Sequence, residues 1–423
     1  MTLWRHPDFR RLWIGETVSA VGSQVTLLAL PLMAVLVLHA SPLEMGLLTA
    51  TGMAPWVVFA LVVGVWVDRL PRLRPVLIAA DLGRAAVLLS VPLVALGGVV
   101  ALPQLYVVAF LAGTLTLAFN VAYLAYLPTL IERDRLVEAN GKLQTSQAAA
   151  QIGGPSLAGV LVQVVTAPFA LLADAVSFLV SAVCLARIEA PEHPRERTSS
   201  GSWVRDLRAG LGFVVGQPLQ RAGAGAAATL NFFGMGQFAI LVLFATRDLG
   251  LSPGVIGLAF GAGSIGGLVG AVAAPTVAAR IGSPRAIKAA MLGFPVALAL
   301  VPLSAAAGTE LGAAAILAAA ELVGGLAVST FDVTLVSLLQ AETPNELMGR
   351  VSGAASFVTQ SAKPAGALAA GWLAQAIGVE TTLWVTAAGG LLILPWVMFG
   401  RFEVRARGAA GPGGIAPETA EVA

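Results

Sequence analysis

Positive charge alternates along this chain, and that alternation most constrains its fold. Twenty-two of the 25 Lys and Arg residues lie at every second connection between long apolar segments. The intervening connections carry almost none, with Arg247 as the exception. Loops on the cytoplasmic side of a membrane collect Lys and Arg. The pattern therefore predicts a multi-pass membrane protein with an even number of spans and both termini in the cytoplasm.

The length of the apolar segments sets the expected number of spans. The chain is 57% hydrophobic and only 11% charged, whereas soluble domains carry about 25% charged residues. A helix needs roughly 20 apolar residues to cross a bilayer, and no alternating ten-residue pattern suggests a barrel. An all-α membrane protein with twelve transmembrane helices is therefore predicted, with spans at 9–38, 43–67, 76–99, 103–131, 140–164, 168–187, 219–246, 253–278, 286–306, 311–339, 346–376 and 380–400.

The two halves of the chain repeat each other. Ser41-Pro42 recurs as Ser252-Pro253, and Pro155 corresponds to Pro364, at a spacing of about half the chain. Duplicated six-span halves with a binding site between them are typical of secondary transporters. The predicted organisation is an N-terminal six-helix bundle (1–187), a cytoplasmic linker (188–217), a C-terminal six-helix bundle (218–400) and a disordered cytoplasmic tail (401–423).

The linker contains a short amphipathic pattern. Val204, Leu207, Leu211 and Val214 have helical spacing within residues 203–216, and charged residues face elsewhere. We interpret this segment as a short helix on the cytoplasmic membrane surface. The alternative is a plain linker helix with no further role.

The connection after the second span carries a family signature. It reads Gly64-Val-Trp-Val-Asp68-Arg69-Leu-Pro-Arg72, which resembles the loop 2–3 signature of the major facilitator superfamily, although Pro71 replaces the usual Gly. The resemblance implies that Gly64 and Asp68 form a conformational latch with the helix that starts near residue 345. Arg69 and Arg72 belong to the signature, but the positive-inside rule explains them equally well.

A second motif lies in the fifth span. Gly153-Gly154-Pro155-Ser-Leu-Ala-Gly159 resembles the Gly-Pro motif of the proton-driven exporters of this superfamily. Ordinary packing of small residues is the alternative, because this chain contains 47 Gly. Residues 8–13 and 79–85 further resemble the bacterial branch that includes the enterobactin exporter and macrolide efflux proteins. This branch implies location in the bacterial inner membrane.

Ionisable residues within the predicted spans need a reason, since each costs about 2.5–3.5 kcal/mol on insertion scales. Asp81 and Arg84 are three residues apart on one helix and are interpreted as a structural ion pair. Asp174 is also interpreted as structural. The remaining ionisable residues lie on helices that, by the resemblance, line or flank the central cavity; they are Glu16, Glu321, Asp332 and Lys363.

These cavity residues suggest a coupling mechanism. We expect Glu16, Glu321 or Asp332 to carry the coupling proton, with the substrate contacted by Asn120, Tyr123, Asn231, Gln237 and Lys363. The alternative is that Lys363 pairs permanently with one of the acids. Helical spacing puts Glu321 and Asp332 on one face, about three turns apart.

The predicted function is proton-coupled export of an amphipathic small molecule, such as a drug, a macrolide or a siderophore, by a monomer that works by alternating access. The alternatives are an importer or uniporter of a small nutrient and, in another class, a transport-inactive receptor or scaffold. The sequence contains no recognisable catalytic set, metal cluster or phosphate loop, so no enzyme activity, metal or cofactor is expected. Nucleic-acid binding is not expected either.

Overall fold

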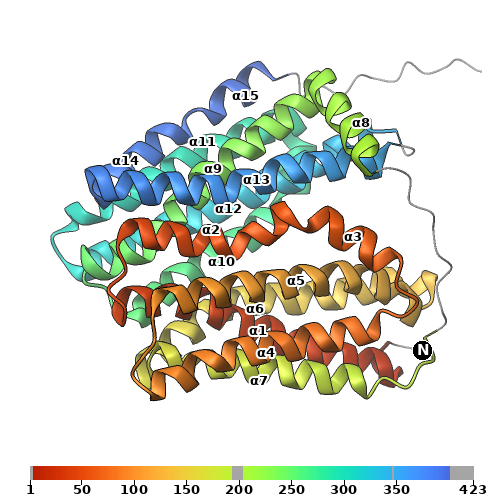
Figure 1. The fold of residues 1–423 in the computed structure, drawn as a ribbon. Coiled ribbons are helices and arrows are strands. Elements are labelled where there is room, and N and C mark those ends of the chain that lie inside the picture. The colour runs from red at the N-terminus through yellow and green to blue at the C-terminus, as the bar shows by residue number, and fades with distance from the viewer. Residues whose placement is uncertain (1–2, 193–202, 345–346, 401–423) are drawn as a thin grey trace, which may run out of the picture.

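The computed structural model describes residues 3–192, 203–344 and 347–400, and within these ranges the fold is entirely helical (Figure 1). The predicted tail at 401–423 lies outside the described residues. The helices are α1 (Pro7–Leu36), α2 (Pro42–Val58), α3 (Ala60–Asp68), α4 (Arg74–Leu96), α5 (Leu102–Leu130), α6 (Leu136–Val165), α7 (Ala167–Ala186), α8 (Trp203–Gly216), α9 (Pro218–Arg247), α10 (Pro253–Ile281), α11 (Ser283–Leu303), α12 (Glu310–Glu342), α13 (Met348–Ile377), α14 (Val379–Gly390) and α15 (Ile393–Phe399).

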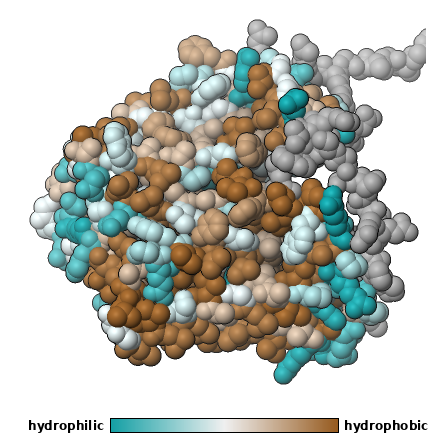
Figure 2. Space-filling model, in the orientation of Figure 1, coloured by the Kyte–Doolittle hydropathy of each residue, from teal (hydrophilic) through white to brown (hydrophobic). Residues whose placement is uncertain are grey.

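The helices are long and apolar enough to cross a membrane. Ten spans in the described part of the chain meet this criterion, and α2 with α3 make an eleventh if the pair, bent by 50°, is one span. Helix α13, at the place of the predicted eleventh span, is not among them and carries Arg350 and Lys363. The predicted count of twelve is therefore not reached by this measure. Figure 2 shows a hydrophobic band between two more hydrophilic ends, as a membrane protein requires.

The repeated sequence motifs occupy matching places in the fold. Ser41 caps α2 and Ser252 caps α10, each followed by Pro at the first helical position. Glu44 completes a capping box with Ser41, because its carboxylate accepts the Ser41 backbone N–H at 2.7 Å. Pro155 and Pro364 lie inside α6 and α13. The duplicated pattern in the sequence thus corresponds to duplicated helix starts and to prolines inside corresponding helices.

The packing separates contacts within each half from contacts between the halves. Helix α1 packs on α6 and α7, and α12 packs on α10 and α11. Two pairs make the most extensive contacts between the halves, α6 with α10 and α2 with α13, and α9 also contacts α1 and α2. Figure 1 shows α2 and α13 side by side on the left, whereas α3 bends away from α13 on the right. The right-hand end holds the junction of α3 and α4 with Arg69, Arg72 and Arg74, and we call it the basic end.

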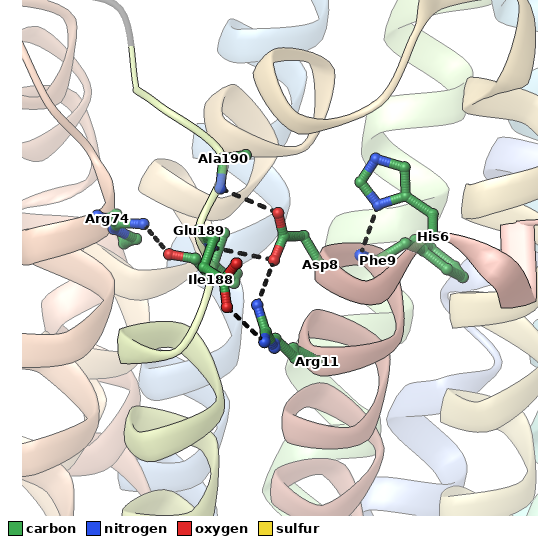
Figure 3. Close-up of polar contacts among 8 residues, drawn as sticks. All are labelled: His6, Asp8, Phe9, Arg11, Arg74, Ile188, Glu189 and Ala190. Atoms are coloured by element: carbon green, nitrogen blue, oxygen red, sulfur yellow. Dashed lines mark hydrogen bonds and ion pairs between the residues drawn. The ribbon is translucent and has the colours of Figure 1, made fainter.

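The chain after α7 is tied to the start of α1 at the basic end (Figure 3). The Asp8 carboxylate accepts the backbone N–H groups of Glu189 and Ala190 at 3.0 and 2.9 Å. Arg11 donates to Asp8 and to the Glu189 carboxylate, each at 2.8 Å. The first residues of the predicted linker are therefore held by charge-assisted hydrogen bonds.

The same segment also holds the start of α4. The Arg74 guanidinium donates to the Ile188 carbonyl, and the Glu192 carboxylate accepts the backbone N–H of Leu73. A carboxylate beside a helix N-terminus satisfies unpaired donors and the helix dipole. Glu192 thus caps α4 although 118 residues separate it from Arg74.

Helix α8 forms where the sequence predicts it, but its apolar face meets protein. Val214 is only 4% exposed. This corrects the interpretation of a helix whose apolar face lies on the membrane, because Leu207, Leu211 and Val214 of the predicted stripe pack against protein, where α8 contacts α9 and α13. The buried contact consists of Val214, Ala224, Val351 and Ala354, with Leu207 and Leu211 packed against it.

Docking of α8 depends on a glycine. A Cβ at Gly210 would lie 2.9 Å from the Ala354 Cβ and would collide with the backbone of Arg350. We expect Gly210→Val to destabilise the protein by about 1–3 kcal/mol, because overpacked contacts cost that much. The melting temperature of purified protein checks this. Gly212→Val on the same helix is the control, because no atom lies within 4 Å of a Cβ there; equal losses for both variants would contradict the docking role.

Candidate functional site: cavities between and within the two halves

Glycine contacts close the end of the molecule opposite the basic end. A Cβ at Gly159 of α6 would lie 3.1 Å from the Cα atoms of both Gly254 and Gly257 on α10. A Cβ at Gly371 of α13 would lie 2.8 Å from the Gly46 Cα on α2. Such spacing requires backbones in direct contact, which only glycine permits. The two most extensive helix pairs between the halves, α6 with α10 and α2 with α13, are therefore in tight contact at this end.

The predicted exporter-like motif lies in this contact. Gly154 makes room for Gln24 of α1, since a Cβ at Gly154 would overlap the Gln24 side chain. Pro155 presents its carbonyl to Gly257, and Gly159 packs on the start of α10. The motif residues of α6 thus contact α1 of the N-terminal half and α10 of the C-terminal half.

The predicted latch residues make no such contact at the basic end. A Cβ at Gly64 would have no atom within 4 Å. Asp68 is exposed at the end of α3, and within the described residues it forms no hydrogen bond or ion pair. Residues 345–346, beside which the latch was expected, lie outside the described residues. The two halves thus meet at one end, while Gly64 and Asp68 remain unpacked at the other.

A cavity of about 430 Å³ lies between the halves and has Glu321 in its wall. Residues from α1, α6, α9, α10 and α12 line it, so both halves contribute. Its lining is mainly small and apolar, with polar groups from Gln24, Gln151, Ser264 and Ser329. Glu321 is the only acidic residue among the described residues of this lining. Pockets of this size with few polar groups are typical binding sites for small molecules.

Close packing of α10 on α12 positions Glu321. A Cβ at Gly263 would lie 3.2 Å from both the Cβ and Oε2 of Glu321, and a Cβ at Gly325 would overlap the Gly263 carbonyl. Glu321 also borders a cavity of about 280 Å³ inside the C-terminal half, together with Gln237. The Thr386 hydroxyl donates to Gln237 Oε1 at 3.2 Å. The structure therefore brings Glu321 and Gln237 together.

Glu16 lies in a different cavity. A space of about 210 Å³ inside the N-terminal half is lined by Glu16, Asn120 and Tyr123, together with Gln144 and Gln147. Three predicted site residues are thus brought together, although not with Glu321. The Glu16 Oε1 atom is shielded from solvent and has no hydrogen-bond partner among the described residues.

The remaining predicted residues are distributed differently. Asp332 and Lys363 interact electrostatically, yet no ion pair within 4.0 Å joins them in the described structure. Asp332 is exposed and Lys363 is half-buried. Asn231 on α9 is half-buried and borders none of the cavities above.

Several lining residues were not predicted. Gln24 and Gln151 are single amides within apolar spans, and nothing in the sequence pattern distinguishes them. Phe238 borders both cavities that contain Glu321. The Gly154 motif was the available signal for Gln24, because the glycine marks the close approach of another helix. As for metals, no group of three or more His, Cys, Asp or Glu residues in the described ranges could hold an ion.

Comparison with known proteins agrees with this architecture. The family model of the Major Facilitator Superfamily matches residues 12–367. The chain is 27% identical to the multidrug efflux pump Tap of Mycobacterium tuberculosis, over 95% of this chain and 93% of the relative. It is 24% identical to macrolide efflux protein A of Streptococcus pyogenes, over 48% of this chain and 50% of the relative.

A solved structure shows the same fold. A bacterial homologue of the iron transporter ferroportin, in an inward-facing state, superposes with a TM-score of 0.73 at 18% identity. The match covers 94% of this chain and 99% of the solved chain. At this identity the likeness concerns the fold alone, and it confirms the predicted all-helical membrane-protein fold.

Proposed function

The chain belongs to the major facilitator superfamily, whose fold is that of membrane transporters, and we propose that it exports amphipathic small molecules in exchange for protons. The observation that carries the proposal is the cavity between the halves, mainly apolar and bordered by Glu321. An apolar lining suits a lipophilic cargo, and a carboxylate in such a lining suits a proton that leaves when cargo binds. The relatives named as efflux pumps support the direction.

The proposed orientation follows from charge. The basic end faces the cytoplasm of a bacterial cell, in its inner membrane, with both termini on that side. Residues 1–187 and 218–400 act as two bundles joined by the linker at 188–217, and the protein acts as a monomer. The glycine contacts then close the outer side in the conformation described above.

Alternating access requires a second conformation, closed at the basic end. In this proposed conformation Gly64 and Asp68 contact the start of α13, and Arg69 and Arg72 flank that contact. A carboxylate near a helix N-terminus is stabilised by the helix dipole. In the proposed cycle this latch forms as the glycine contacts of the outer side separate.

Within the proposed site, cargo lies between Gln237 and Glu321 on one side and Gln24 and Gln151 on the other. Glu16, Glu321 and Asp332 are the candidate proton carriers. Asn120 and Tyr123 act beside Glu16. Lys363 of α13 attracts Asp332 of α12. Asn231 stays a proposed substrate contact only because it lies on α9, a helix expected to line the cavity.

Efflux of a fluorescent cation tests the proposal. We expect cells of an efflux-deficient bacterial strain that express this chain to lose preloaded ethidium faster than cells with an empty vector. A protonophore should abolish the difference, because the proton gradient supplies the energy. Faster entry would instead favour the importer, and absence of flux for ethidium and for a panel of antibiotics would favour the receptor or scaffold.

A further inference from the structure

A charged cluster is buried inside the N-terminal half, apart from the cavity between the halves. Arg84 of α4 pairs with Asp81 on the same helix, and the two residues are only 4% and 0% exposed. Asp174 of α7 is 1% exposed and interacts electrostatically with both. Glu16 of α1 also interacts with Asp81 and Arg84. Four ionisable side chains from three helices therefore share one site.

The packing holds Arg84 centrally in this cluster. Its guanidinium lies 4.4 Å from the ring centroid of Phe119 and 4.0 Å from that of Phe178. Aromatic faces on two sides stabilise the cation without neutralising it. Arg84 Nε is buried and has no hydrogen-bond partner within the described residues, whereas the Asp81 carboxylate also interacts with the Ser181 hydroxyl of α7. A buried guanidinium nitrogen without a partner is unusual for a pair that serves only as a static brace.

Hydrogen bonds and local space hold the Asp174 carboxylate in place as a second partner for Arg84. The Thr26 hydroxyl donates to its Oδ2 atom, and the Ser177 hydroxyl lies 3.0 Å from its Oδ1 atom. Gly22 of α1 leaves the space that Asp174 occupies, because a Cβ there would lie 2.6 Å from Asp174 Oδ1. The other titratable groups that face the cluster are Tyr123 of α5, beside Glu16, and Cys184 of α7, which packs against α1 at Gly15.

Charge balance requires bound protons in this cluster. The three carboxyl groups of Glu16, Asp81 and Asp174 face one guanidinium, so full ionisation would leave two negative charges uncompensated. Buried unpaired charges cost several kcal/mol each, and such groups take up protons instead. At least one carboxyl group of the cluster is therefore protonated at rest.

Cavities flank the cluster on two sides. Glu16 borders the cavity of about 210 Å³ with Tyr123. Asp174 and Arg84 border another cavity, of about 340 Å³, which lies among α1, α2, α4, α5 and α7. The ion pair of Asp81 and Arg84 interacts electrostatically with both Glu16 and Asp174. The carboxyl groups therefore form a chain from one cavity to the other.

We propose that Glu16, Asp81 and Asp174 form a proton pathway through the N-terminal half, with Arg84 moving between Asp81 and Asp174 as the proton passes. A proton arriving on Asp81 Oδ2 neutralises that carboxylate and releases the guanidinium, which pairs with ionised Asp174. When Asp174 takes up the proton, Arg84 returns to Asp81. This inference rests on the proton coupling proposed above and adds a pathway through the N-terminal half to the candidate carrier Glu321.

Proteoliposomes separate coupling from transport. Ethidium accumulation driven by an imposed pH gradient is compared with ethidium counterflow at equal pH on both sides. We expect Asp174→Asn and Asp81→Asn each to lower gradient-driven accumulation by about tenfold, a factor that corresponds to 1.4 kcal/mol. Both variants should retain counterflow, which also shows that they are folded. Glu132→Gln, an exposed acid outside the cluster, is the matched control and should resemble unaltered protein.

The outcomes distinguish this inference from the proposed function. If unaltered protein shows no gradient-driven accumulation, proton coupling fails and the pathway fails with it. If unaltered protein is coupled and both Asn variants remain coupled, only the pathway is overturned. Thr26→Val provides a second test if an Asn variant does not fold. It keeps both carboxyl groups and removes only one hydrogen bond to Asp174. It should change the pH midpoint of coupled transport, and an unchanged midpoint overturns the proposal.

Discussion

Replacement of Glu321 by Gln is expected to abolish ethidium transport driven by a pH gradient, with a loss of about a hundredfold or more. Glu321 is the acid in the wall of the cavity shared by the two halves, and Gly263 and Gly325 hold α10 and α12 close around it. Gln preserves the size of the side chain but cannot release a proton. Gradient-driven accumulation in proteoliposomes measures the effect.

Control variants test whether the loss of gradient-driven transport is specific to Glu321. Glu310→Gln changes an exposed acid in the first turn of the same helix and should leave transport unchanged. Glu16→Gln and Asp332→Asn test the other candidate carriers in the same assay. Full gradient-driven transport by all three cavity variants would show that none of these acids carries the coupling proton.

Replacement of Gly159 by Leu is expected to open the end of the molecule that the glycine contacts close. The Cβ of the new side chain alone would lie 3.1 Å from the Cα atoms of Gly254 and Gly257 on α10, so the remaining atoms of Leu have no room in the contact. Overpacking costs about 1–3 kcal/mol. An energy of that size shifts a two-state equilibrium by about 5- to 150-fold. The variant should therefore populate the opposite conformation.

Spin labels measure this shift directly. Val164 on α6 and Leu258 on α10 are exposed near the contact and suit nitroxide labels after replacement by Cys in a Cys184→Ala background. Double electron–electron resonance should report longer distances between the two labels in Gly159→Leu than in the unaltered protein. Gly153→Leu is the control on the same helix, because a Cβ there meets no atom within 4 Å. Unchanged distances in Gly159→Leu would contradict the role of the contact.

Local pattern predicted much of the fold. The paired Ser-Pro starts of α2 and α10 and the clusters of basic residues indicated the helices, their alternation and the duplication. Errors arose where the environment of a helix mattered. Helix α8 has the periodicity of a membrane-surface helix, but α13 and α9 cover its apolar face. Amphipathicity shows that a face will be buried and leaves open whether lipid or protein buries it.

The charged residues were predictable one by one, but their grouping was not, and neither were the lining residues Gln24, Gln151 and Phe238. The rarity of charge within apolar spans identified Glu16, Glu321, Asp81 and Arg84. Helical spacing also showed that Asp81 and Arg84 face the same way. Nothing in the spacing indicated that Asp174, 90 positions after Arg84, interacts with this pair.

By itself, the sequence determined the class of this protein, its helices, its family and the small set of charges that a membrane interior tolerates. These follow from hydropathy and charge counted along the chain, because a bilayer acts on each segment independently. Tertiary structure alone decided that Glu16 lies with Asn120 and Glu321 with Gln237, and that glycines close one end while Gly64 stays unpacked at the other. Such groupings depend on which helix backbones come within a few ångströms of each other, and that distance is a property of packed pairs of helices.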